Sequence, residues 1–151
     1  MPIIIGIDPG LSGGIAVIDG DSVEACKMPQ TERDIYDVLG EVKPPCVAYL
    51  EKVGAMPGQG VTSMFTFGRG YGFLRGVLTS LQIPIHDVTP VQWQRKMGIS
   101  VKKGESKTAK KNRHKQLAQQ MFPHLAKGMT HHKADALLIA AYGKRYHSGT
   151  S

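Results

Sequence analysis

The chain has 151 residues, of which 41% are hydrophobic, and this size and composition suit a single globular domain over residues 1–151. Its formal net charge of +7 indicates a polyanionic partner. No apolar run approaches the roughly 20 residues that a membrane span needs. The first residues also lack the basic start and the cleavage site of a signal peptide, so we expect a cytoplasmic protein, in a bacterial or phage-infected cell, with no membrane partner.

The positive charge is concentrated in one segment. Residues 1–90 carry 6 basic and 10 acidic side chains, whereas residues 91–115 carry 9 basic side chains and one acidic one. A solvated helix face is the alternative, but we expect this basic segment 91–115 to bind DNA phosphates, because the preceding part of the chain is net acidic. The candidate contacts are Lys102, Lys103, Lys107, Lys110, Lys111, Arg113 and Lys115.

The N-terminal residues predict three short antiparallel strands. Residues 3–8, IIIGID, form an apolar run rich in β-branched side chains, which is typical of a buried strand. Residues 13–19 follow after the turn LSGG, and Gly20 with Asp21 predicts a hairpin into a third strand near residues 22–28. Strands joined by such short turns are antiparallel neighbours.

A helix and a fourth strand follow. Residues 31–42 have a plausible N-cap in Thr31 and an apolar face that begins at Ile35 and repeats at i+3, i+4 and i+7. Residues 46–51, CVAYLE, then predict a strand. A helix of this length between two strands suits a parallel crossover.

The second half of the chain is mainly helical. Residues 62–81 predict a helix, residues 83–88 a fifth strand, and residues 91–97, 106–121 and 131–145 three more helices. Trp93 is expected in the core rather than as a platform for a base. The order of elements predicts an α/β fold, with a mixed five-stranded sheet (three antiparallel strands, then two parallel) and helices on both faces.

The helix over residues 62–81 is rich in glycine. Each glycine in a helix interior costs about 1 kcal/mol relative to alanine. We therefore expect either a bend or a close approach by another element. Because Gly68, Gly72 and Gly76 are four residues apart, this face would suit the interface of a symmetric dimer.

Three carboxylates lie at the ends or on the apolar side of buried segments. Asp8 ends the first strand, Glu51 ends the fourth, and Asp135 lies on the apolar side of the last helix. If strands one and four are parallel neighbours, Asp8 and Glu51 emerge at one edge, which the last helix can reach. Taken singly, each is compatible with a structural role. Together they predict a site for divalent cations, because clustered carboxylates stay ionised only when a cation neutralises them.

Two histidines precede the last of these carboxylates. His131 and His132 lie four and three residues before Asp135, so both can share its helix face. Histidine at such a place can ligate a metal ion or move a proton near neutral pH, although a capping or surface role is the commoner one.

The segments GIDPGLSGGIAVID, YLEKV and HHKADALLIAAY resemble the RuvC-type Holliday junction resolvases of the RNase H-like superfamily. The resemblance covers nearly the whole chain, and the glycine-rich stretch after Glu51 resembles the phage and chloroplast branch. It implies an RNase H-like fold and a homodimer that makes paired symmetric nicks in four-way DNA junctions. It further implies a catalytic site of Asp8, Glu51, Asp135 and His132 that holds two Mg²⁺ ions, for which Mn²⁺ substitutes. His131 is the alternative to His132.

Other side chains are candidates to contact DNA. Met56 and Gln59, in the loop beside the strand-end glutamate, are placed to enter an opened junction. Arg69 and Arg75, on the glycine-rich helix, are candidates for phosphate contacts. The alternative functions are another RNase H-like nuclease acting on RNA–DNA hybrids or flaps, and a non-catalytic junction-binding protein. An actin-like phosphotransferase is disfavoured because the chain is too short for a two-domain nucleotide cleft.

Overall fold

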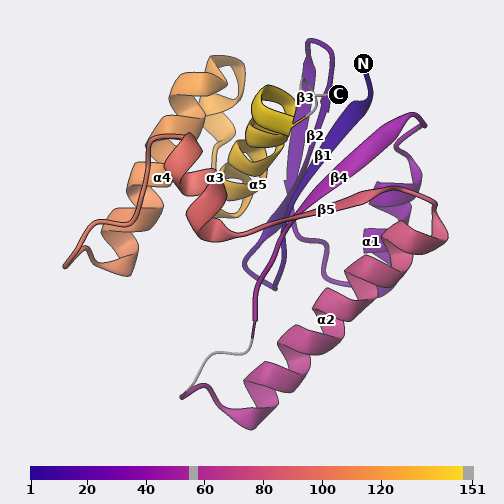
Figure 1. The fold of residues 1–151 in the computed structure, drawn as a ribbon, viewed down its shortest axis with the longest axis horizontal. Helices are drawn as coiled ribbons and strands as arrows, with labels where there is room; N and C mark the ends of the chain where they lie inside the picture. Colours follow the sequence, from indigo (N-terminus) through magenta and orange to yellow (C-terminus); the bar gives the residue numbers. More distant parts are fainter. Residues whose placement is uncertain (55–57, 148–151) are drawn as a thin grey trace.

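A computed structural model describes residues 1–54 and 58–147 as a five-stranded sheet between two layers of helices (Figure 1). The strands occur in the spatial order β3-β2-β1-β4-β5. β1 pairs antiparallel with β2 and parallel with β4, while β2 pairs antiparallel with β3 and β4 parallel with β5. Their bounds are β1 (Ile3–Asp8), β2 (Gly14–Asp19), β3 (Ser22–Lys27), β4 (Cys46–Glu51) and β5 (Ile85–Val88). The predicted mixed sheet is confirmed.

The helices divide between the two faces of this sheet. Figure 1 shows α1 and α2 on one side and α3, α4 and α5 on the other. None of the helices in the described part of the chain is long and apolar enough to cross a membrane. The helix bounds are α1 (Glu32–Gly40), α2 (Val61–Ser80), α3 (Pro90–Lys96), α4 (Lys107–Met121) and α5 (His131–Tyr142), with a short 3₁₀ helix at Pro123–Gly128.

The last helix ends earlier than predicted. α5 stops at Tyr142 and continues as one wider, π-helical turn over Gly143–His147, whereas a regular helix was expected as far as residue 145. Gly143 packs against the ring of Tyr49 in β4, with which a Cβ atom at this position would collide. This contact with the sheet is made at the point where the helix widens.

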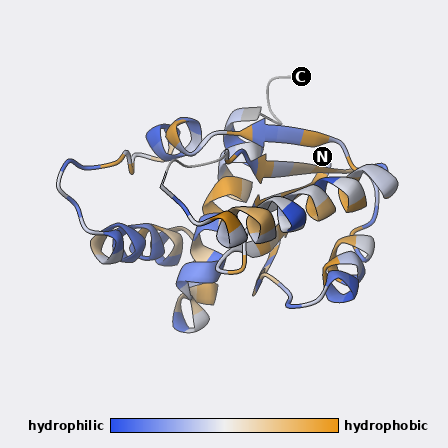
Figure 2. Cartoon of the chain, turned by 90° about the horizontal axis from the view of Figure 1, so that it is seen from below, coloured by the Kyte–Doolittle hydropathy of each residue, from blue (hydrophilic) through white to orange (hydrophobic). Residues whose placement is uncertain are grey.

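Alternate residues of the strands build two cores, as the two-residue repeat of a strand requires. Ile4, Ile18 and Tyr49 pack under α3, α4 and α5, whereas Ile5 and Ile7 pack under α1 and α2. Figure 2 shows hydrophobic residues gathered along the strands and the inner sides of the helices, with hydrophilic residues on the outer sides. The central strands β1, β2 and β4 are therefore buried on both faces, whereas the edge strands β3 and β5 are partly exposed.

Two glycines let α5 lie directly on the sheet. A Cβ atom at Gly6 of β1 would collide with the carbonyl of Ala136 and would lie 2.5 Å from the nitrogen of Ala140. A Cβ atom at Gly14 of β2 would collide with the carbonyl of His132. The close contact fixes the height of α5 above β1 and β2, and with it the positions of the side chains that α5 carries.

α2 has an unusually exposed first half. Figure 1 shows it extending from the sheet, and Val61 and Phe65 are 86% and 71% exposed. At Gly68, Gly72 and Gly76, no described atom outside the local helix lies within 4 Å of the place that a Cβ atom would occupy. The close approach expected at these glycines is thus not made within the described chain, and the dimer interface stays a prediction.

Candidate active site

The first two predicted site residues meet at one edge of the sheet. In the parallel pair β1–β4, Ile7 lies opposite Leu50, so Asp8 and Glu51 are the next residues of adjacent strands. Asp8 is half-buried, and Glu51 is buried with 9% of its surface exposed. The predicted neighbourhood of these two strand ends is confirmed.

α5 brings Asp135 to the same edge. Burial raises the pKa of Asp8 well above its usual range, and repulsion from Glu51 and then from Asp135 raises it further. Burial also raises the pKa of Glu51; the hydrogen bond from Trp93 opposes this rise, and the charge of Asp135 adds to it. The three predicted carboxylates therefore lie within electrostatic reach of one another, and their repulsion adds to the effect of burial on the pKa values of Asp8 and Glu51.

This donor set suits a hard divalent cation. Among residues 1–54 and 58–147, no three His, Cys, Asp or Glu side chains are already arranged as ligands around one point. The chemistry nevertheless fits, because a cation would relieve the repulsion that raises the carboxyl pKa values. Hydrogen bonds engage Oε2 of Glu51 and Oδ1 of Asp135, so the second oxygen of each carboxylate is available to such an ion. The ligand roles themselves stay a prediction.

The two candidate histidines have different surroundings. Nδ1 of His132 lies 2.8 Å from the carbonyl oxygen of Ser12, in the β1–β2 turn. Because a carbonyl only accepts, Nδ1 is the donor, and in the neutral form of the ring Nε2 has the lone pair that a metal ligand needs. His131 is exposed and lies one residue earlier on the same helix. This arrangement favours His132 over His131 as a ligand, in agreement with the order that the family resemblance implies.

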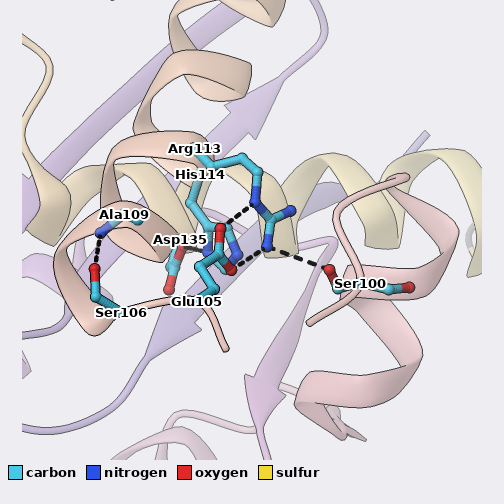
Figure 3. Close-up of polar contacts among 7 residues, drawn as sticks. All are labelled: Ser100, Glu105, Ser106, Ala109, Arg113, His114 and Asp135. Atoms are coloured by element: carbon cyan, nitrogen blue, oxygen red, sulfur yellow. Dashed lines mark hydrogen bonds and ion pairs between the residues drawn. The ribbon is translucent and has the colours of Figure 1, made fainter. Parts of the chain in front are cut away.

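Two buried side chains, from α3 and α4, form hydrogen bonds with two of the carboxylates. Trp93 of α3 is fully buried, as expected, and donates its indole N–H to Oε2 of Glu51 over 2.8 Å. His114 of α4 is 2% exposed, and its Nδ1 lies 2.9 Å from Oδ1 of Asp135 (Figure 3). The sequence interpretation missed His114. A signal was present, because His114, Ala118 and Met121 share the inward face of the basic helix.

A cleft of about 940 Å³ opens beside this cluster. Asp8, Asp135 and the two histidines line one part of it, and Phe67 and Arg69 of α2 line another. Its volume is that of a typical ligand cleft. The cleft therefore gives a substrate direct access to Asp8 and Asp135, with Arg69 as a cation on its wall.

The basic segment reaches the same cluster. Lys111 of α4 lines the cleft. Its charge offsets part of the rise that burial causes in the pKa of Asp8, and the charge of Lys110 does the same for Glu51. These two lysines thus lie where an entering phosphate would be drawn toward the carboxylates. Their phosphate contacts stay a prediction.

Two of the predicted DNA-binding arginines are engaged within the chain. Arg113 donates to both carboxylate oxygens of Glu105, at 2.7 and 2.9 Å, and to the carbonyl of Ser100 (Figure 3). Arg75 forms an ion pair of 2.6 Å with Asp87. Both arginines thus have acidic partners within the chain, and DNA binding by either one stays a prediction.

The remaining candidates lie mostly on the surface. Lys102, Lys103, Lys107 and Gln59 are exposed, and Lys115 is half-buried. Met56 lies outside the described residues. None of these positions is in conflict with a contact to DNA.

Comparison with known proteins relates the fold to that of resolvases. No protein-family model matches the chain, and no curated protein sequence matches it significantly. The solved structure of RuvC from Thermus thermophilus aligns with a TM-score of 0.62 at 19% identity, over 95% of both chains. The same protein in complex with Holliday junction substrate gives a TM-score of 0.63 at 19% identity, over 96% of both chains.

A viral protein shares the same architecture. The Fowlpox virus resolvase, solved with substrate Holliday junction DNA, aligns with a TM-score of 0.52 at 18% identity, over 92% of this chain and 91% of that one. This chain has the RuvC-like, RNase H-like fold. The fold expected from the sequence resemblance is thereby confirmed.

Proposed function

We propose that this chain is a Holliday junction resolvase, a Mg²⁺-dependent endodeoxyribonuclease that makes paired symmetric nicks in four-way DNA junctions. The observation that carries the proposal is the cluster of Asp8, Glu51 and Asp135 beside an open cleft, on a fold that aligns along nearly its whole length with junction resolvases. A non-catalytic junction-binding protein would have no use for three carboxylates held together at a cost in free energy.

The chain's own residues would prepare the scissile phosphate. Asp8, Glu51, Asp135 and His132 would hold two Mg²⁺ ions, or Mn²⁺ in their place. When bound, the ions would supply Lewis-acid stabilisation to the attacking and leaving oxygens of the phosphodiester. Lys110 and Lys111 would draw the phosphate toward the carboxylates. The proton that His132 shares with Ser12 would fix the ring orientation and leave Nε2 for an ion.

The exposed lysines of the basic segment would hold the arms of the junction. Lys102, Lys103 and Lys107 would contact phosphates without reading base sequence, so binding would weaken steeply with salt. Arg69, on the wall of the cleft, would contact the strand to be cut. Gln59, exposed in the loop that follows β4, would lie near the centre of the junction.

A homodimer would match the symmetry of the substrate. One chain carries one carboxylate cluster, and a four-way junction needs two matched incisions. The exposed glycine face of α2, with Val61 and Phe65 open to solvent, supports an interface there.

The experiment compares substrates of equal length. A synthetic four-way junction, an RNA–DNA hybrid, a 5′ flap and a linear duplex are incubated with the protein and Mg²⁺, and initial cleavage rates are measured. We expect the junction to be cut fastest and the duplex to be left intact. Faster cleavage of the hybrid or the flap would replace this function by that of another RNase H-like nuclease.

A further inference from the structure

The carboxylate cluster is supported by a pair of buried aromatic donors from two other elements. Trp93 donates to Glu51 over 2.8 Å, and the Nδ1 of His114 contacts Asp135 over 2.9 Å. The two rings also touch each other, with their centroids 5.6 Å apart in an edge-on arrangement at 69°. One continuous layer of side chains from α3 and α4 therefore contacts a carboxylate of β4 and a carboxylate of α5.

An indole N–H can only donate, so Trp93 is the donor in its bond to Glu51. The ionised form of Asp135, which is the form that would bind a cation, can only accept, so in that form Nδ1 of His114 carries the proton of their bond. Its Nε2 is buried and has no hydrogen-bond partner among the described residues. The His114 ring is thus committed to a single polar contact, and that contact is with a carboxylate of the candidate site.

We propose that Trp93 and His114 are positioning residues, which orient Glu51 and Asp135 so that each presents its second oxygen to a divalent cation. A carboxylate is free to rotate about its terminal bond unless a neighbour holds one oxygen. In a buried setting a hydrogen bond is electrostatically strong, and the removal of such an outer partner typically lowers metal affinity or activity about 10- to 100-fold. This inference rests on the proposed function only in assuming a cation at the cluster.

The geometry also explains why α3 and α4 belong to the site. Neither helix contributes a predicted ligand. Each nevertheless contacts one through a side chain that is distant in sequence: Trp93 lies 42 residues from Glu51, and His114 lies 21 residues from Asp135. Because Trp93 is fully buried and His114 is 2% exposed, neither side chain is placed to touch DNA directly. Their contribution would be made through the carboxylates.

The test measures cation binding without DNA. Calorimetry gives the dissociation constant of Mn²⁺ for the full chain and for variants, and Mn²⁺ is chosen because such sites bind it at least as readily as Mg²⁺. His114→Leu removes the donor, whereas His114→Asn keeps an N–H near the position of Nδ1. Trp93→Phe removes the indole N–H and keeps an aromatic ring. Phe122→Leu, a change in the same core away from the carboxylates, is the matched control.

We expect His114→Leu and Trp93→Phe each to weaken Mn²⁺ binding about 10-fold or more. His114→Asn should restore most of the affinity, and Phe122→Leu should leave it unchanged even where it lowers the melting temperature. Affinities for His114→Leu and Trp93→Phe equal to that of the wild type, or no recovery in His114→Asn, would overturn the inference. So would a wild-type chain that binds no Mn²⁺.

The two proposals can fail separately. A wild-type chain that binds Mn²⁺ but cuts no junction would refute the resolvase function and leave the positioning role in place. If the wild-type chain cuts junctions but substitutions at His114 and Trp93 do not change its cation affinity, the positioning role is refuted and the resolvase function is kept. A loss of folding is recognised from the circular dichroism spectrum, and His114→Asn and Phe122→Leu then still separate positioning from general packing.

Discussion

The contact between α5 and the sheet at Gly6 ties stability to the geometry of the site. In Gly6→Ala, the new Cβ atom would lie 2.5 Å from the nitrogen and 2.7 Å from the Cβ of Ala140. Ordinary contact between such atoms begins at about 3.5 Å, so α5 must move outward by about 1 Å. α5 carries both His132 and Asp135, so the same movement displaces two of the proposed ligands from Asp8.

Two opposing effects decide the change in stability. Replacing glycine by alanine in a strand gains about 0.5–1 kcal/mol, because the unfolded chain becomes less flexible. Overpacking a tight contact costs about 1–3 kcal/mol, and here the obstacle is the backbone of α5, which cannot change rotamer. A backbone obstacle places the cost at the upper end of this range, so we expect a net loss of about 2 kcal/mol in the free energy of unfolding. A displacement of about 1 Å at the reacting groups should also lower the cleavage rate about 100-fold.

Urea denaturation and junction cleavage under single-turnover conditions measure the two effects. Gly40→Ala is the matched control, because no described atom lies within 4 Å of the place that the new Cβ atom would take at this surface position. We expect the control to keep wild-type activity and stability or to gain slightly. If Gly6→Ala is as stable and as active as Gly40→Ala, then α5 does not lie on the sheet as described, and the argument for the site is refuted.

Three further predictions concern the charge, the glycines and the basic segment. Without metal, Asp8→Asn should become more stable than the wild type as the pH rises through the raised pKa of Asp8, because only the wild type must ionise a buried carboxyl. If the difference in unfolding free energy between the two proteins stays constant from acidic to neutral pH, this prediction is contradicted. Gly72→Ala should weaken self-association measured by sedimentation if this face of α2 is the dimer interface, and should only stabilise the helix, by about 1 kcal/mol, if it is not. Lys103→Gln should lower the slope of log binding constant against log salt concentration, measured with the junction, by about one. Arg113→Gln should chiefly lower the melting temperature, because it breaks the pair with Glu105. Equal slopes for Lys103→Gln and the wild type would show that Lys103 does not contact the junction.

The positions of the carboxylates could be predicted from sequence because they depend on short-range patterns. An apolar run ends where the strand ends, so Asp8 and Glu51 mark their own places. The short turns and the intervening helix then make β1 a neighbour of both β2 and β4. The periodicity of the last helix likewise placed Asp135 on its buried side, with an error only where the helix widens after Tyr142.

The supporting contacts could not be predicted in the same way. The bond between Trp93 and Glu51 depends on how α3 packs on the sheet, and the bond between His114 and Asp135 depends on how α4 packs on α5. No local pattern specifies either one. The charge pattern also did not predict the two-pronged ion pair that Arg113 forms with Glu105, the one acidic residue of the basic segment.

The central claim is tested most directly by mapping the cuts in a mobile four-way junction labelled on each strand. The wild-type protein with Mg²⁺ should produce nicks at symmetric positions in two opposing strands. Asp8→Asn should bind the same junction with nearly unchanged affinity and cut neither strand, because it removes a proposed metal ligand and no phosphate contact. Cutting by Asp8→Asn at the wild-type rate, or the absence of junction nicks with the wild type and Mg²⁺, would contradict the account.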